Sequence, residues 1–201
     1  MLDVAALDVP KKQAEILIAA SGLFQQFGIK RVTVEEICQT AAVSKMTFYK
    51  YYKNKDELVK FIWDKGFEQA FQKFDQIREM NIPFGQKLEL MLQLKEDYAT
   101  KFSYQLALEY FYATAELKGF FEQLASTSLN HFLEFIKESQ EKGEVRADLN
   151  PQFLLTILNN IKYLVKDEAL INQYPSYKDF VLEVNNFIYY GILPRPDAKK
   201  S

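Results

Sequence analysis

The chain has 201 residues, of which 48% are hydrophobic and 15% aromatic, so it can bury a core in one or two small domains. The single cysteine excludes an internal disulfide framework and is typical of a reducing cytoplasm, where we expect the protein. The sequence has one histidine and shows neither a Cys/His cluster nor a Gly-rich phosphate loop. It therefore offers no recognisable set of catalytic residues. We therefore expect no enzyme, no cofactor and no metal site.

The formal net charge of −2 conceals an asymmetry along the chain. Residues 10–60 hold nine Lys or Arg and five Asp or Glu, a net charge of +4, whereas residues 61–201 hold 16 and 20, a net charge of −4. A basic N-terminal part on an acidic remainder fits a protein that contacts DNA at one end. No secretory signal and no long charge-free apolar run is present, so no membrane contact is expected.

Residues 1–9 are predicted to be a loose leader, followed by a helix over Lys11–Phe27 with Gly28 as its C-cap. Thr33 and Glu36 have the spacing of a capping box, which predicts a second helix that ends at Ala41 and Ala42. Ser44 is placed to cap a third helix, and Asn54, three residues before Glu57, to begin a fourth.

The third helix carries an unusual set of side chains. From Lys45 to Lys55 there are four lysines and no acid, interleaved with three tyrosines. Ammonium and hydroxyl groups donate to phosphate, while the Thr47 methyl group and the aromatic rings can contact thymine methyl groups. The alternative is a solvated basic helix with structural tyrosines, because charge runs are usually solvated surfaces.

The rest of the chain also reads as helical. One long helix is predicted from Asp56 to about Met80, and others over 88–100, 104–117 and 119–141, with a loop at Gly143 and a start at Asn150-Pro151. Apolar stripes predict two further helices, one from Phe153 to Val165 and one from Phe180 to Gly191, before a frayed tail. The fold class expected is therefore all-α.

The run from Ile16 to Ile62 resembles the N-terminal domain of TetR/AcrR-type transcriptional regulators nearly end to end. Three pieces carry the resemblance: AxxLFxxFG, the Thr-Val-x-x-Ile helix start, and AVSKxTFYxYYxNKDEL. It implies a three-helix helix-turn-helix DNA-binding domain over residues 1–55 and a helical ligand-binding and dimerisation domain over residues 56–201.

The resemblance also implies which residues contact DNA: Thr33, Ser44, Lys45, Met46, Thr47, Tyr49, Lys50, Tyr51 and Lys55. Thr33, Tyr49 and Lys55 are expected at phosphates, and Lys45, Met46, Thr47, Lys50 and Tyr51 nearer base edges.

Three residues depart from the family pattern. Ala42 stands where the turn usually has Gly, which costs about 1 kcal/mol if the backbone is left-handed there. Met46 adds an apolar side chain where a small one is common. Cys38 replaces a small Ala, and its place on a packing face favours a buried structural thiol over a redox sensor.

Two further sites follow from the resemblance. A cavity for a small apolar or aromatic effector is expected among aromatic residues of the body, with the alternative that these side chains only form the core. The candidate ligand-binding residues are Trp63, Phe67, Phe71, Tyr110, Phe111, His131 and Phe135. The last two helices are expected to form a homodimer interface through Ile157, Ile161, Leu164, Phe180, Val184, Phe187 and Ile188.

We therefore expect a ligand-released repressor that binds a palindromic double-stranded DNA operator as a homodimer. Two recognition helices about 34 Å apart would read the two half-sites. One alternative is a regulator without a small-molecule inducer. Another is a helical ligand-binding or interaction module whose DNA-binding part has lost its function.

Overall fold

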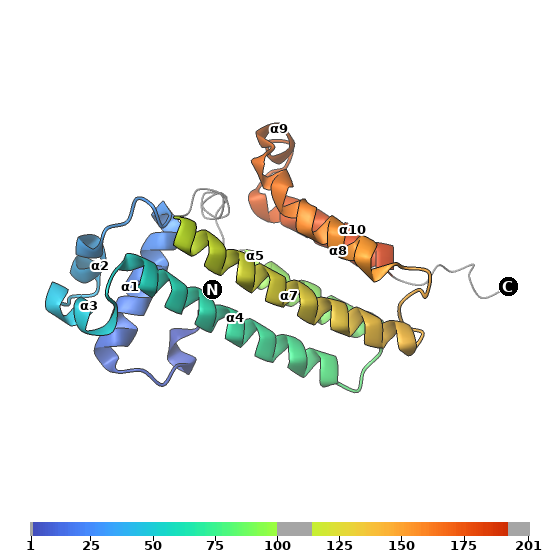
Figure 1. The fold of residues 1–201 in the computed structure, drawn as a ribbon, viewed down its shortest axis with the longest axis horizontal. Helices are drawn as coiled ribbons and strands as arrows, with labels where there is room; N and C mark the ends of the chain where they lie inside the picture. Colours follow the sequence, from blue (N-terminus) through green and yellow to red (C-terminus); the bar gives the residue numbers. More distant parts are fainter. Residues whose placement is uncertain (1, 100–113, 193–201) are drawn as a thin grey trace. The chain divides into compact units, whose positions relative to one another are not determined.

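The computed structural model describes residues 2–99 and 114–192, and the regular structure of these residues is entirely helical (Figure 1). The all-α expectation is confirmed. The elements are η1 (Val4–Ala6), α1 (Lys11–Phe27), α2 (Val34–Thr40), α3 (Lys45–Tyr51), α4 (Lys55–Glu79), α5 (Phe84–Ala99), α7 (Ala115–Glu141), α8 (Pro151–Ile161), η2 (Lys162–Lys166), α9 (Glu168–Ile171) and α10 (Tyr177–Ile192). Most of the predicted 104–117 helix and the predicted C-terminal tail lie outside the described residues.

These residues divide into two compact units. Unit 1 lies within Met1–Asp75 and Lys101–Leu124, and unit 2 within Gln76–Thr100 and Ala125–Ser201. Each unit has its own buried side chains. None of the described helices is long and apolar enough to cross a bilayer.

In unit 1, α1 supplies the centre of the core. Ile16, Leu17, Ala20 and Phe24 recur at helical spacing and are completely buried, so one face of α1 packs inward. Gly28 ends the helix at φ 80°, and its N–H donates 2.9 Å to the Phe24 carbonyl. The predicted helix and its glycine cap are both confirmed.

The expectation of a loose leader is wrong. Leu2 is buried, and Asp3 caps the short helix η1 by accepting from the Ala5 N–H at 3.1 Å. The side-chain amide of Gln69 on α4 holds the Asp3 backbone at both ends: it accepts from the N–H at 2.8 Å and donates to the C=O at 2.9 Å. Tertiary packing on α4 orders this segment, and no local pattern signals that packing.

Unit 2 is built around α5, the C-terminal part of α7, and the helices that follow. Its buried apolar residues include Met91 of α5 and Ile136 of α7, and the rings of Phe84 and Phe135 stack with centroids 5.7 Å apart. Arg78 forms an ion pair with Glu138, which ties the end of α4 to α7 within this unit. The Gln140 side chain donates to the carbonyls of Arg146 and Leu149 and fixes the loop after α7.

Three predicted boundaries are also wrong. The helix predicted over 88–100 already begins at Phe84. A break was expected between the helices over 104–117 and 119–141, but α7 runs without interruption from Ala115 to Glu141 through Gly119. A single glycine costs a helix only about 1 kcal/mol, which the packing of Leu117 and Phe121 in the unit 1 core offsets. The helix predicted from Phe153 to Val165 changes at Ile161 into the 3-10 helix η2.

Candidate nucleic-acid interface

The helix α2 begins with the capping box that the sequence predicts. The Glu36 N–H donates 3.2 Å to the Thr33 hydroxyl, and the Glu36 carboxylate accepts from the Thr33 N–H at 2.8 Å. The carboxylate also accepts from the Thr33 hydroxyl at 2.9 Å, and the bond from the Thr33 N–H, followed by this one, holds the pKa of Glu36 below its usual value. Thr33, an expected phosphate contact, is exposed at the start of this helix.

The turn after α2 has the hydrogen-bond pattern of a Schellman motif. The N–H of Ala42 donates 3.2 Å to the Gln39 carbonyl, and the N–H of Val43 donates 3.0 Å to the Cys38 carbonyl. Ala42 has φ 50°, and no other non-glycine residue of the described chain has a positive φ. The turn therefore has a left-handed backbone at a residue that carries a Cβ atom. This is the strained position expected where Ala42 replaces the usual Gly.

The helix α3 is capped by Ser44. The Ser44 hydroxyl accepts from the Thr47 N–H at 3.1 Å and shares a 2.9 Å hydrogen bond with the Thr47 hydroxyl. Phe48, on the inner face, is completely buried and anchors α3 to the core. The side-chain packing of α3 therefore fixes which of its faces is presented outward.

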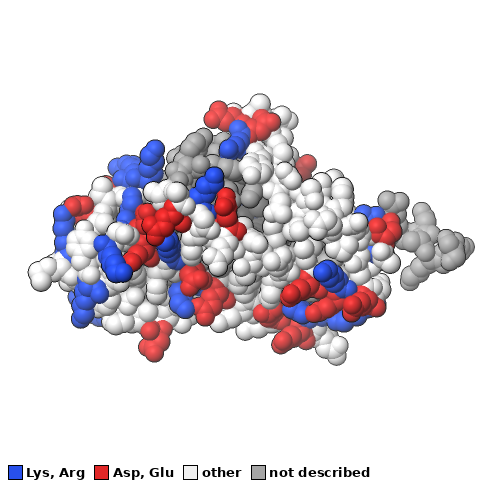
Figure 2. Space-filling view, viewed as in Figure 1, with Lys and Arg blue, Asp and Glu red and all other residues white. Residues whose placement is uncertain are grey.

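That outer face carries most of the expected DNA contacts. Met46 is 86% exposed and Tyr49 53%, and Lys50 extends over the Tyr51 ring with its Nζ atom 5.8 Å from the centroid. Six of the nine expected DNA-contact residues are exposed: Thr33, Ser44, Lys45, Met46, Tyr49 and Lys50. The other three, Thr47, Tyr51 and Lys55, are half-buried. Figure 2 shows Lys and Arg side chains gathered over the region where Figure 1 places α2 and α3, with Asp and Glu side chains among them.

Tyr52 differs from Tyr49 and Tyr51 in that its side chain is buried. Its hydroxyl accepts from the Gln13 side-chain amide of α1 at 3.0 Å, and burial raises its pKa to about 12. It is a structural residue that joins the end of α3 to α1.

Lys45 has a partner that sequence reasoning missed. Its ammonium forms an ion pair with the carboxylate of Glu35 in the first turn of α2. The hydrogen bond from Lys45 lowers the pKa of Glu35, and the same bond raises the pKa of Lys45. Ten residues and a turn separate the two, so no helical spacing signals the pair.

Lys55, at the start of α4, also has internal partners. Its ammonium donates 2.7 Å to each of the carbonyls of Ile29 and Val32, and lies 3.4 Å from that of Lys30. The lysine thus holds the connection between α1 and α2 against α4. The expected contact between Lys55 and a phosphate stays a prediction.

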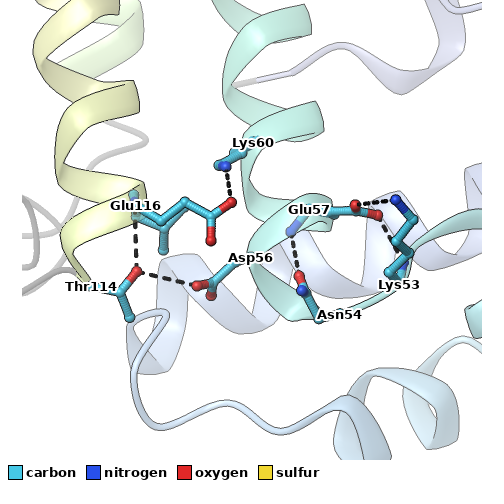
Figure 3. A network of polar contacts seen from close by, with 8 residues as sticks. Lys53, Asn54, Asp56, Glu57, Lys60, Thr114 and Glu116 are labelled. Carbon is cyan, nitrogen blue, oxygen red and sulfur yellow. Dashed lines mark hydrogen bonds and ion pairs between the residues drawn. The ribbon is translucent and has the colours of Figure 1, made fainter.

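The start of α4 is fixed on two sides (Figure 3). Asn54 caps the helix by accepting from the Glu57 N–H at 2.8 Å, as predicted, and the Glu57 carboxylate accepts from the Lys53 N–H at 2.9 Å. On the other side, Thr114 at the start of α7 donates 3.2 Å to the Asp56 carboxylate.

A second contact joins the same two helices one turn further along. Lys60 of α4 forms an ion pair with Glu116 of α7 (Figure 3). Thr114 also accepts from the Leu117 N–H at 3.3 Å, so this threonine caps α7 while it contacts α4. The first turn of α7 and the first turns of α4 are therefore linked by polar side chains within unit 1.

Cys38 is a free, buried cysteine. Burial raises the pKa of its thiol, and the negative charge of Glu35 raises it further. Both effects disfavour the reactive thiolate. The expected burial of Cys38 is confirmed, and its structural role stays a prediction.

The candidate ligand-binding residues fall in both units. In unit 1 the rings of Trp63 and Phe121 meet edge to face at 5.8 Å, and those of Phe67 and Phe71 lie 6.0 Å apart. In unit 2 Phe135 is buried against Phe84, and His131 is half-buried. Tyr110 and Phe111 lie outside the described residues. The effector site among these residues stays a prediction.

The candidate dimer residues differ in exposure. Phe180 and Ile188 are buried within unit 2, Ile161 and Val184 are half-buried, and Ile157, Leu164 and Phe187 are exposed, Phe187 by 75%. Tyr190, which the sequence stripe did not include, is also exposed on α10. The helices α8 and α10 thus carry large apolar side chains that this chain leaves in contact with solvent.

The helices α1, α2 and α3 together form the reading unit, and comparison with known proteins identifies its family. Residues 16–62, which span most of α1 through the first two turns of α4, match the family described as "Bacterial regulatory proteins, tetR family". The chain is 29% identical over 137 residues to the "Uncharacterized HTH-type transcriptional regulator YhgD" of Bacillus subtilis (strain 168), covering 68% of this chain and 71% of that protein.

Two solved structures share the fold. The fatty acid degradation regulator FadR from Bacillus halodurans superposes with a TM-score of 0.72 at 20% identity, over 94% of this chain and 100% of that one. The transcriptional regulator FadR from Bacillus subtilis, solved in complex with stearoyl-CoA, superposes with a TM-score of 0.68 at 19% identity, over 89% and 98%. The segment of residues 16–62, which contains the capped helix-turn-helix, therefore belongs to the tetR family of bacterial regulatory proteins, and the described chain as a whole has the fold of the two solved regulators.

Proposed function

We propose that this chain is a cytoplasmic repressor that binds a palindromic operator as a homodimer and leaves it on binding a small apolar or aromatic effector. DNA recognition is assigned to residues 1–55, and effector binding and dimerisation to residues 56–201. Chemistry on a substrate is not part of this function, since the relatives are transcriptional regulators.

The observation that carries the proposal is the presentation of α3. Phe48 and Tyr52 fix this helix to the core, while Met46, Tyr49 and Lys50 project from it into solvent. A short helix held rigidly with one polar and aromatic face outward is the form in which helix-turn-helix proteins enter the major groove. Thr47 and Lys45 are assigned to base edges, and Thr33, Tyr49 and Lys55 to phosphates.

A dimer is supported by the exposed apolar side chains of α8, η2 and α10. Phe187 is 75% exposed, and full burial of a large apolar side chain contributes about 1.5–3 kcal/mol. Ile157 and Leu164, 36% and 39% exposed, would also leave water on association and would each contribute less. One recognition helix contacts few base pairs, so a dimer is also what specific recognition of DNA needs.

The effector is proposed from two features. The FadR of Bacillus subtilis, which shares the fold, was solved in complex with stearoyl-CoA. The present chain carries Trp63, Phe67 and Phe71 along α4. A long-chain acyl group is therefore the first apolar effector to test.

Release is proposed to occur by a population shift. Effector would favour a conformation in which α4 is tilted, and α4 is joined to the reading unit through Lys55 and to α7 through Asp56 and Lys60. Effector and operator would then weaken the binding of each other by the same factor.

The decisive experiment selects bound duplexes from a random pool with the full-length protein. We expect a palindrome whose half-site centres are separated by about 10 base pairs or a multiple of that spacing. If no selected duplex binds more tightly than about 10 μM at low salt, the proposal is rejected.

Thermal unfolding separates the inducible regulator from one without an inducer. Stearoyl-CoA and stearate, each added with and without the selected operator, should raise the melting temperature of the free protein and lower the affinity for the operator. A protein that binds the operator but responds to neither probe nor to a wider set of apolar compounds would be a regulator without a small-molecule inducer.

A further inference from the structure

The ion pair between Glu35 and Lys45 lies across the helix-turn-helix unit itself. Glu35 is in the first turn of α2, and Lys45 is the first residue of α3. Both side chains are more than half exposed, so the pair is on the surface and not part of the core.

Both partners stay charged through the neutral range. The bond to Lys45 lowers the pKa of Glu35 and raises the pKa of Lys45, so each group stabilises the ionised form of the other. The charges of both also act on the nearby Cys38 thiol, in opposite directions.

The pair changes the charge that α3 and its flanks present to DNA. Of the four lysines between Lys45 and Lys55, Lys45 is paired with Glu35, Lys53 with Glu57, and Lys55 donates to backbone carbonyls. Lys53 pairs with a residue of α4 and Lys55 binds the connection between α1 and α2, whereas Lys45 is on α3 itself. A carboxylate therefore neutralises a lysine that is assigned to the DNA contact.

We propose that Glu35 competes with DNA for the ammonium group of Lys45 and so weakens binding to every duplex. This inference rests on the proposed role of α3 in DNA binding. To contact a phosphate, Lys45 must either break its ion pair with Glu35 or keep it. If the pair is kept, the negative Glu35 carboxylate comes close to the phosphates. A lysine bound to DNA releases condensed counterions, and a lysine already neutralised by a carboxylate contributes little of that gain.

Weaker binding has a consequence for control. An effector needs a smaller difference in affinity between the two conformations to empty an operator that is held less tightly. By lowering the affinity for the operator, Glu35 thus makes it easier for an effector to release the protein from DNA.

The test is a double-mutant cycle with the full chain. Duplex affinity is measured across a range of salt concentrations for the wild type, Glu35→Gln, Lys45→Gln and the double variant, with the selected operator and with an unrelated duplex. Glu35→Gln should tighten binding to both duplexes about two- to five-fold at low salt, the range typical of an exposed ion pair. The salt slope should steepen by up to about one unit.

In the Lys45→Gln background the same replacement should have little effect, because the competed group is gone. Equal tightening in both backgrounds would mean that Glu35 acts by direct repulsion of phosphate, and the inference would be overturned. Asp64→Asn on α4 is the matched control, since it removes one exposed acid outside the helix-turn-helix and should leave both affinities unchanged.

Failure of this inference is distinct from failure of the proposed function. If the wild type shows no salt-dependent binding to any duplex, the DNA-binding proposal itself is wrong. If the wild type binds but Glu35→Gln behaves like Asp64→Asn, only the role of Glu35 is rejected. Circular dichroism melts of all five proteins show whether any change of affinity comes from partial unfolding.

Discussion

The ammonium group of Lys55 donates a 2.7 Å hydrogen bond to the backbone carbonyl of Val32, across 23 positions of the chain. A second bond of the same length goes to Ile29. The connection between α1 and α2 and the first residue of α4 are therefore linked directly, and a lysine expected at the DNA is also part of the framework that holds the reading unit.

This arrangement predicts two effects of Lys55→Gln. The free energy of unfolding should fall by about 1–3 kcal/mol, because hydrogen bonds from a charged donor to half-buried carbonyls are lost. If Lys55 also contacts phosphate, the salt slope of duplex binding should flatten by about 0.9 units. Urea unfolding and fluorescence titrations measure the two effects. Lys73→Gln, an exposed lysine further along the same helix, should alter neither.

Ala42→Gly should stabilise the protein. Ala42 has φ 50° in a turn whose hydrogen bonds match those at Gly143, where φ is 72° and no Cβ is present. Relief of the left-handed alanine should raise the free energy of unfolding by up to about 1 kcal/mol, and the melting temperature by about 2–4 °C.

Ala41→Gly is the control for this change. Ala41 precedes Ala42 with φ −78°, an ordinary helical value, and its methyl group is buried. Here glycine should lower the melting temperature, because it gains nothing in the folded turn and loses buried surface. Equal shifts for the two variants would show that the backbone conformation of Ala42 carries no cost.

The capping box of α2 should make stability depend on pH. The pKa of Glu36 is lowered in the folded state, mainly by the hydrogen bond from the Thr33 N–H. A lowered folded pKa gives a stabilising contribution that is present above the unfolded pKa and lost as pH falls through the folded one. The advantage of the wild type over Glu36→Gln should therefore be present near neutral pH and disappear in acid. Denaturant midpoints of the two proteins, compared at about pH 7 and about pH 3, give the measurement. A constant difference between them would rule out the ionised carboxylate as its source.

The hydroxyl of Thr114 should stabilise unit 1 by joining α4 to α7. Thr114→Val removes both the bond to Asp56 and the cap on the Leu117 N–H, while keeping the shape of the side chain. The expected loss is about 1 kcal/mol in the free energy of unfolding. Thr114→Ser keeps the hydroxyl and should retain most of this stability in the same denaturation experiment; a serine variant as unstable as the valine variant would contradict the assignment.

Replacement of an exposed apolar residue on α10 should dissociate the proposed dimer. Phe187→Glu places a charge on a side chain that is 75% exposed in the single chain, so the monomer should fold normally but associate at least tenfold more weakly. Sedimentation measures the association directly. Ile18→Glu alters an exposed apolar residue of α1 instead and should leave association intact.

Local patterns predicted the reading unit well because its elements are specified within a few residues. The capping box at Thr33 and Glu36, the caps at Ser44 and Asn54, and the stop at Gly28 each depend on contacts within four positions. The same reasoning failed for the leader at Leu2 and Asp3, which is ordered by Gln69 on α4. It also failed at Gly119, where packing overrides a weak local signal.

The sequence by itself determined the helical class, the place of the helix-turn-helix and the family, because periodicity and capping are properties of neighbouring residues. Only the tertiary structure decided what the charged side chains do. Lys45 meets Glu35 across a turn, Lys55 binds carbonyls more than twenty residues earlier, and Thr114 contacts Asp56 on another helix. These contacts depend on how the helices pack. A count of lysines in the sequence therefore describes the charge of the reading unit, and the packed structure shows which of those charges already have partners.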